Sequence, residues 1–121
     1  EMMANGDASN FASTGGWNLG KEKNGWFLGH FMDSDLHASN LEIQMIKLEK
    51  GYSKESKKIN PKVKVITILI KGYFELSFPE INKTFYLEKE GDFIKFNLSS
   101  KHIGKAIEKT TIITIKWPSI K

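Results

Sequence analysis

The sequence predicts an all-β domain, either a small antiparallel sandwich or a barrel. Short segments of alternating apolar and polar residues recur along the chain, with turn signals between them at intervals of roughly 8–12 residues. One β-branched run, Val63 to Ile70, is typical of a buried strand. No segment has the periodicity of an amphipathic helix three turns long. At 121 residues the chain has room for one domain with its own core.

The N-terminal region differs from the rest in composition. Residues 1–20 are rich in Asn, Gly, Ala and Ser, and we expect them to form a tail or arm. Phe11 and Trp17 are the side chains expected to attach this arm to a surface, and Glu1 is expected to be a processing remnant before a native methionine. The remaining residues, 21–121, are expected to form the β domain.

The first expected strands flank an acidic turn. Trp26–Met32 predicts a short aromatic strand, and Leu41–Leu48 predicts a second strand, whose alternation changes phase after Met45. Such a change of phase suggests a β-bulge. The stretch Lys50–Pro61 is polar, and we expect a connection there.

The later strands have clearer signals. Alternation and turn residues predict strands at Val63–Ile70, Tyr73–Phe78, Lys83–Leu87, Phe93–Phe96 and Lys109–Trp117, with a further strand beginning at His102. In the Val63–Ile70 strand both faces are apolar, so each face needs a covering layer. The cover is expected to be the N-terminal segment or a second copy of the chain, and we predict a homodimer.

The composition argues against two classes of binding partner, nucleic acids and membranes. All 18 basic residues are lysines, against 14 acidic residues, which gives a net charge of +4. Arginine provides the planar fork that recognises guanine edges and phosphates, so its absence argues against a nucleic-acid partner. No apolar run approaches the roughly 18 residues of a membrane-spanning helix, and no membrane association is expected. Without a visible signal peptide or any cysteine, the chain is expected to be cytoplasmic.

One stretch resembles a motif of a known family. The stretch from Gly91 to His102 reads as a turn, a short apolar strand, a polar loop and a histidine at the start of the next strand. It is similar to the second conserved motif of the cupins, in which the final histidine is a metal ligand. The resemblance spans roughly residues 26–118 and implies a jelly-roll barrel, also called a double-stranded β-helix.

The motif that supplies the other cupin metal ligands is degenerate here. Counting from Gly51 puts Lys57 and Ile59 where two histidines are expected, and counting back from Gly72 puts Val65 at the glutamate position. A catalytic transition metal needs at least three ligands from His, Asp, Glu or Cys. We therefore predict no metal site and no cofactor, with a divalent metal held by an atypical ligand set as the alternative.

A second likeness is to a group of small bacterial cupins of poorly defined function. It rests on four segments: Trp26–Phe31, Ile68–Phe74, Lys89–Asp92 and Trp117–Ser119. This likeness supports the fold and implies no activity.

The candidate site residues are polar side chains on the expected barrel strands. His102 is the candidate catalytic residue, because an imidazole titrates near neutral pH and can act as a general acid or base. Glu42, Gln44, Lys57, Thr67 and His102 are the candidate ligand-binding residues. We expect the protein to bind a small polar or anionic molecule in the barrel. The alternatives are an isomerase- or epimerase-like or atypical metal-dependent cupin enzyme that uses His102, and a structural dimerisation module.

Overall fold

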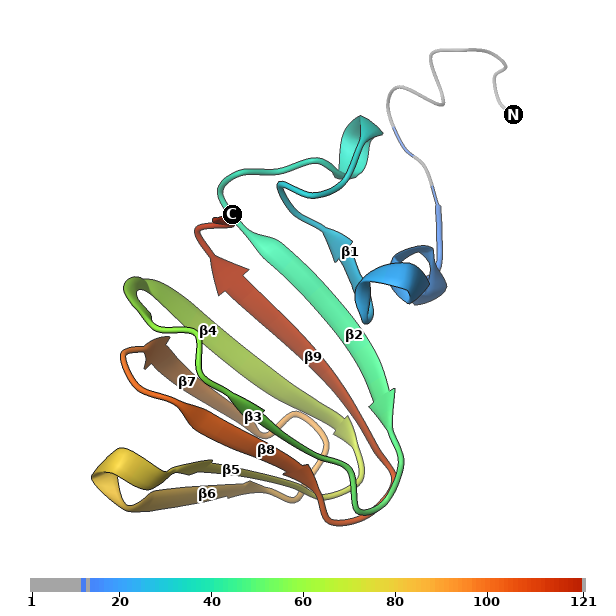
Figure 1. The fold of residues 1–121 in the computed structure, drawn as a ribbon. Coiled ribbons are helices and arrows are strands. Elements are labelled where there is room, and N and C mark those ends of the chain that lie inside the picture. Colours follow the sequence, from blue (N-terminus) through green and yellow to red (C-terminus); the bar gives the residue numbers. More distant parts are fainter. Residues whose placement is uncertain (1–11, 13, 121) are drawn as a thin grey trace.

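The computed structural model describes residues 12 and 14–120, which form two antiparallel β-sheets facing each other (Figure 1). One sheet has five strands in the order β1-β2-β9-β4-β7, and the other has four in the order β3-β8-β5-β6. The strands are β1 (Trp26–Leu28), β2 (Glu42–Leu48), β3 (Ser53–Ser56), β4 (Asn60–Lys71), β5 (Phe74–Phe78), β6 (Lys83–Leu87), β7 (Phe93–Leu98), β8 (His102–Ala106) and β9 (Thr110–Trp117). The described part also contains 3-10 helices η1 (Trp17–Lys23), η2 (Ser34–Leu36) and η3 (Pro79–Ile81).

The course of the chain is that of a jelly roll. From β2 to β5 each strand lies in the sheet opposite the one before it, and after the β5–β6 hairpin the crossing between sheets resumes through β7, β8 and β9. The predicted all-β class and the jelly-roll architecture are confirmed. The sheets do not join into a closed barrel, since β1, β7, β3 and β6 remain edge strands.

The structure corrects three details of the predicted strands. The aromatic strand ends at Leu28 instead of Met32. The bulge expected after Met45 is absent, because β2 pairs with β9 in unbroken register from Glu42 to Leu48. The change of phase has another cause: β2 is partly apolar on both faces. The stretch predicted as a polar connection contains β3, which lacks apolar alternation because it is a largely exposed edge strand.

The inner face of the five-stranded sheet changes from apolar to charged along its length. The register places three cross-strand rows on this face. The rows are Ile46–Ile112–Leu69, then Gln44–Thr114–Thr67, then Glu42–Lys116–Val65–Phe96. The first row belongs to the main core, which also holds Leu48, Phe74, Leu76, Phe78, Leu87 and Ala106. The space between the sheets is therefore filled by apolar side chains at one end and lined by polar ones toward the other.

The outer face of the same sheet is apolar. Two cross-strand rows run across it, Ile43–Ile115–Ile66–Lys95 and Met45–Ile113–Ile68–Phe93. The isoleucines of these rows are only half-buried, and Phe93 is 61% exposed. We refer to Ile43, Met45, Ile66, Ile68, Phe93, Ile113 and Ile115 as the outer apolar face.

The start of the turn between β4 and β5 requires a glycine. Gly72 has a φ of +107°, in the region that L side chains rarely adopt. A Cβ atom there would collide with the carbonyl oxygen of Lys109 and with Thr110. The Thr110 hydroxyl also accepts a hydrogen bond from the Tyr73 amide, at 3.1 Å. The close approach fixes this turn against the start of β9.

The described part of the N-terminal region packs at one edge of the five-stranded sheet. Helix η1 contacts β1 and β2, and the Lys47 ammonium lies 5.7 Å from the centroid of the Trp17 ring. In Figure 1, η1 lies beyond β1, at the edge of the sheet. Of the arm predicted over residues 1–20, positions 1–11 and 13, including Phe11, lie outside the described residues. Within the described part, no helix is long and apolar enough to cross a membrane.

Candidate functional site

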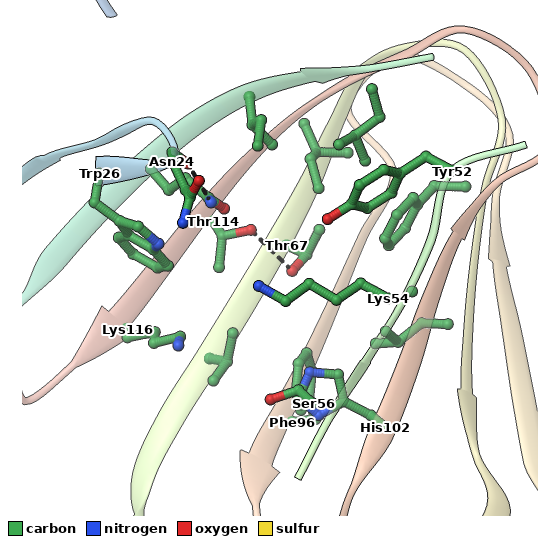
Figure 2. A pocket seen from close by; sticks show the side chains of 18 of the residues that line it. Asn24, Trp26, Tyr52, Lys54, Ser56, Thr67, Phe96, His102, Thr114 and Lys116 are labelled. Atoms are coloured by element: carbon green, nitrogen blue, oxygen red, sulfur yellow. Dashed lines mark hydrogen bonds between the residues drawn. The ribbon is translucent and has the colours of Figure 1, made fainter. Parts of the chain in front are cut away.

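A cavity of about 240 Å³ lies between the two sheets. Figure 2 shows the polar side chains that surround it. The volume equals that of roughly eight molecules of liquid water, which is small for a ligand pocket. Its apolar wall continues into the core, and its polar wall is formed by Asn24, Trp26, Gln44, Tyr52, Lys54, Ser56, Thr67, His102, Thr114 and Lys116.

The charged groups of this lining are basic. Lys54 comes from β3 and Lys116 from β9, so the two lysines reach the cavity from opposite sheets (Figure 2). His102, on β8, is the third titratable nitrogen base. No Asp or Glu side chain is among the described residues that line this cavity. The result is a small compartment with an excess of positive charge.

Lys116 is a partly buried lysine held over an aromatic ring. Its ammonium lies 4.9 Å from the centroid of the Trp26 ring, within the range of a cation–π interaction. Burial lowers the pKa of Lys116, and nearby Lys58 and Lys54 lower it further, while Glu42 acts in the opposite direction. Glu42 lies directly across from Lys116 in the β2–β9 register, yet the two side chains form no ion pair within 4.0 Å.

His102 lies in an apolar corner of the cavity. Its ring centroid is 5.1 Å from that of Phe96 and 6.1 Å from that of Phe78. The Nδ1 atom is buried and has no hydrogen-bond partner among the described protein atoms. Burial, followed by the charge of Lys116, lowers the pKa of His102. A protonated imidazole donates from both nitrogens, so a site without an acceptor for Nδ1 favours the neutral ring.

The middle of the cavity wall carries neutral polar groups. Thr67 and Thr114 are paired directly across the adjacent strands β4 and β9, and their hydroxyl oxygens lie 3.3 Å apart. The Gln44 side-chain amide donates a hydrogen bond to the Asn24 carbonyl, at 2.8 Å. Asn24 has a φ of +54°, the left-handed conformation that ends η1. These groups give the cavity both donors and acceptors beside its cations.

The structure brings together three of the five predicted ligand-binding residues. Gln44, Thr67 and His102 line the cavity. Glu42 instead lines a neighbouring cavity of about 150 Å³. Lys57 lies outside both cavities; its side chain is 78% exposed and pairs with Glu55 at 3.8 Å.

Lys57 does not line either cavity because it follows the end of β3. The residues of β3 that face the cavity are Lys54 and Ser56, and Ser56 lies opposite His102 in the β3–β8 register. In the sequence, the sign of this strand is that Lys54 and Ser56 are two residues apart, so that both point to the same face. The stretch around them is polar and the repeat is too short to indicate a strand. For Lys116 the signal was clearer, since Thr114 and Lys116 are polar positions two residues apart in an apolar strand.

The residues around the cavity do not fit the metal that cupin barrels commonly hold. Of the residue types that bind transition metals, His102 alone is among the described lining residues, and Lys54 and Lys116 would repel a cation. Nowhere in residues 12 and 14–120 do three His, Asp, Glu or Cys side chains form a group that could hold a metal ion. The geometry therefore suits an anion better than a cation.

The neighbouring cavity lies beside the C-terminal segment. It is lined by His30, Glu42, Lys58, Asn60, Val63, Leu98, Lys116 and Ile120, so Lys116 lines both cavities. His30 Nδ1 lies 2.5 Å from the Ser119 hydroxyl oxygen, which also accepts a hydrogen bond from the His30 amide at 3.0 Å. These contacts connect two segments of the small-cupin likeness, Trp26–Phe31 and Trp117–Ser119.

Comparisons with known proteins identify the fold. No model of a protein family and no curated protein matches the chain. Among solved structures, the chain is similar to an HTH_3 family transcriptional regulator from Vibrio cholerae, with a TM-score of 0.58 and 22% identity over 65% of this chain and 43% of that one. A Cupin_2 domain of an XRE family transcriptional regulator from Enterobacter cloacae gives 0.57 and 15%, over 65% of this chain and 82% of that one. Ectoine synthase from P. lautus gives 0.57 and 13%, over 68% and 56%.

These likenesses establish the fold alone. The chain covers less than half of the Vibrio regulator and little more than half of the ectoine synthase. The matched proteins include both regulators and an enzyme, so a shared fold does not specify an activity. The predicted resemblance to a cupin with degenerate metal-binding motifs is confirmed at the level of the fold.

Proposed function

Starting from a cupin fold in which the described cavity lining has lysines and no carboxylate, we propose that this protein binds a small organic anion between its sheets. The observation that carries the proposal is the composition of the lining. Lys54, Lys116 and His102 face the cavity, and no described acidic residue does. The neutral hydroxyl and amide groups beside them add hydrogen bonds for the rest of the ligand.

The electrostatic argument favours an anion by a wide margin. At an effective dielectric constant of 20, a carboxylate 4 Å from an ammonium gains about 4 kcal/mol, and a cation loses a similar amount. In this cavity the two lysines come from opposite sheets, so a carboxylate between them contacts both. A charge-assisted hydrogen bond to either contributes about 1.5–3 kcal/mol.

The size and the apolar wall limit the ligand. A volume of about 240 Å³ admits a compact carboxylate and excludes a nucleotide or a long acyl chain. Apolar side chains of the lining, Val65 and Phe96 among them, suit a short hydrocarbon portion. The expected ligand thus has one acidic end and one small, weakly polar body.

Thermal unfolding in the presence of matched compounds tests the proposal. A ligand at 100 times its Kd stabilises the folded state by about 2.7 kcal/mol, which raises the Tm by roughly 10 °C in a domain of this size. We expect such shifts with small carboxylates and none with the corresponding amides or alcohols. Lys54→Met should abolish the shift.

The matched control for Lys54→Met is Lys105→Met, which removes the same charge from an exposed position on β8, the strand paired with β3. Lys105→Met should leave the carboxylate response intact. An equal response of the two variants would mean that net charge, and not the cavity, attracts the anion.

A second function, acid–base catalysis on the bound anion, is favoured by the state of His102. The lowered pKa of His102 keeps its imidazole neutral, and therefore able to accept a proton, at neutral pH. Once a carboxylate that binds is known, His102→Gln should leave its binding within about threefold while slowing any proton exchange at the ligand's α-carbon, measured in deuterated water. Exchange that is unchanged in the variant would rule this role out.

A homodimer completes the proposed function. The outer apolar face extends across β2, β9, β4 and β7, and the main contacts of the N-terminal helix η1 are with β1 and β2. A face of this kind, exposed on a monomer, is typical of a protein–protein interface. A second copy of the chain can cover the outer apolar face without any other protein. An isologous pairing of the two sheets buries this face on both copies. In this arrangement the barrels bind ligand independently.

A further inference from the structure

Lys116 differs from the other lysines of the described chain in combining three properties. Its side chain is partly buried, it lines both cavities, and its ammonium is held against the Trp26 ring at 4.9 Å. A lysine whose only task was to attract an anion would gain most from a flexible, exposed position, such as that of Lys54. Lys116 is instead fixed at a defined place in the wall.

The groups around Lys116 favour loss of its proton. The titratable and charged side chains that face it from the neighbouring elements are Glu42 on β2, Lys54 on β3, Lys58 after β3, and His102 on β8. Only Glu42 and the Trp26 ring stabilise the ammonium. Burial and the two lysines outweigh them, and the net effect on the pKa of Lys116 is downward. Desolvation together with neighbouring cations is the arrangement that activates a nucleophilic lysine.

Protonation decides whether a lysine can act as a nucleophile. With an ordinary pKa of 10.4, roughly one side chain in 2,500 is neutral at pH 7, and each unit of lowering raises this fraction tenfold. A carbonyl compound that enters the cavity therefore meets, at Lys116, an amine whose neutral fraction is larger than that of an ordinary lysine.

We propose that Lys116 forms an imine with a small carbonyl compound whose carboxylate is held by Lys54. The neutral Nζ attacks the carbonyl carbon and forms a C–N bond, and the proton that Nζ loses goes to the carbonyl oxygen, giving a carbinolamine. The hydroxyl group then takes up a proton and leaves as water, the C=N bond forms, and the nitrogen gives up its remaining proton, with no oxidant or reductant required. His102 lines the same cavity, and its neutral imidazole can accept and donate the protons that move in these two steps.

The substrate class follows from the spacing of charge and nucleophile. The two lysines approach from opposite sheets, so the carbonyl carbon and the carboxylate of one small molecule face different walls. α-Keto and aldehyde acids have this form and fit a cavity of about 240 Å³. This inference rests on the proposed anion binding, to which it adds a covalent step at a named atom.

Reductive trapping tests the inference on the whole protein. Glyoxylate or pyruvate is added at neutral pH with cyanoborohydride, which reduces an imine to a stable secondary amine. Intact mass spectrometry should then show one adduct, with the mass of the carbonyl compound less one oxygen atom, and peptide mapping should place it on Lys116. Acetaldehyde, which lacks the carboxylate, should label Lys116 at least tenfold more slowly.

Two variants at Lys116 and one at a distance complete the test. Lys116→Arg keeps the charge and removes the nucleophile, and Lys116→Met serves if the arginine variant unfolds at a lower temperature. Either should lose the adduct, while Lys105→Arg should keep it. Adducts spread over many lysines, an adduct on Lys54, or undiminished labelling in Lys116→Arg would overturn the inference. A carboxylate-dependent Tm shift without trapping would overturn the covalent step and leave the proposed anion binding standing.

Discussion

The two faces of the five-stranded sheet differ in how polar groups interrupt them. The inner face holds the apolar core but is interrupted by Thr67, Thr114 and Lys116, whereas the outer face carries Ile66, Ile68, Ile113 and Ile115. Adjacent residues of the same strands make both faces, because successive side chains point to opposite sides. One set of strands thus supplies the polar groups of the proposed ligand site and the apolar surface of the proposed dimer.

The largest expected effect concerns the outer face. Ile68→Lys puts an ammonium among Ile113 and Phe93, its neighbours in the register. In a dimer interface an unpaired buried charge costs several kcal/mol, so the dimer Kd should rise roughly a thousandfold. Analytical ultracentrifugation should show a dimer for the original chain and a folded monomer for the variant.

Ile59→Lys is the matched control for this change. Ile59 is 54% exposed and lies between β3 and β4, away from the outer apolar face. The control should remain dimeric. A monomer for the original chain at every concentration would remove the proposed role of the outer face and leave the inner one untouched.

On the inner face, the paired hydroxyls of Thr67 and Thr114 offer a double-mutant cycle. Thr67→Val leaves the buried Thr114 hydroxyl without its partner at 3.3 Å and should lower the free energy of unfolding by about 1–3 kcal/mol. Thr67→Val with Thr114→Val removes both hydroxyls and should recover most of that loss. Urea unfolding of Thr67→Val, Thr114→Val and the double variant completes the cycle. Additive losses would mean that the two hydroxyls do not pair in solution.

A smaller effect is expected from pH. Because burial holds the pKa of folded His102 below 6.5, the unfolded chain binds a proton that the folded chain does not as pH falls through 6.5. The free energy of unfolding should therefore decrease from pH 7 down to the folded pKa and show no further change from this group below it. His102→Asn should flatten this slope in urea titrations.

His37→Asn is the control for the pH measurement, because the His37 side chain is exposed. It should retain the slope of the original chain. Equal slopes in all three proteins would show that His102 is protonated as readily in the folded state as in the unfolded one.

The smallest effect is expected at Lys57, which lies on neither face. Its pairing with Glu55 at 3.8 Å is on the surface, so Lys57→Met should change the free energy of unfolding by less than about 0.5 kcal/mol. The carboxylate-dependent Tm shift should stay as in the original chain, in contrast to Lys54→Met. A lost shift in Lys57→Met would return the ligand site to the position that the cupin spacing implied.

The strands that could be predicted from the sequence are those in which burial selects a recognisable pattern of apolar residues. Strand β4 is recognisable because its inner and outer faces are both apolar, and β5 because it alternates strictly. Strand β3 was missed because it is short, exposed and paired on one side only, so that packing selects no apolar residue in it.

The candidate site was predicted in part for the same physical reason. Thr67 and Gln44 are polar interruptions in apolar strands, which a sequence shows directly. Lys54 and Lys116 line one cavity because β3 of one sheet and β9 of the other face the same space, although the two residues are 62 positions apart along the chain (116 less 54). Only the topology of the jelly roll brings them to that cavity.

The edge position of β3 has a consequence for kinetics. This strand has four residues and pairs only with β8, so its amides are expected to exchange with solvent through frequent local opening. Lys54 belongs to β3 and Lys116 to β9, so an anion held by both lysines would bridge the two sheets. Hydrogen exchange at β3 should therefore slow on binding by the same factor by which the ligand stabilises the paired strand, so that one short edge strand reports occupancy of the cavity.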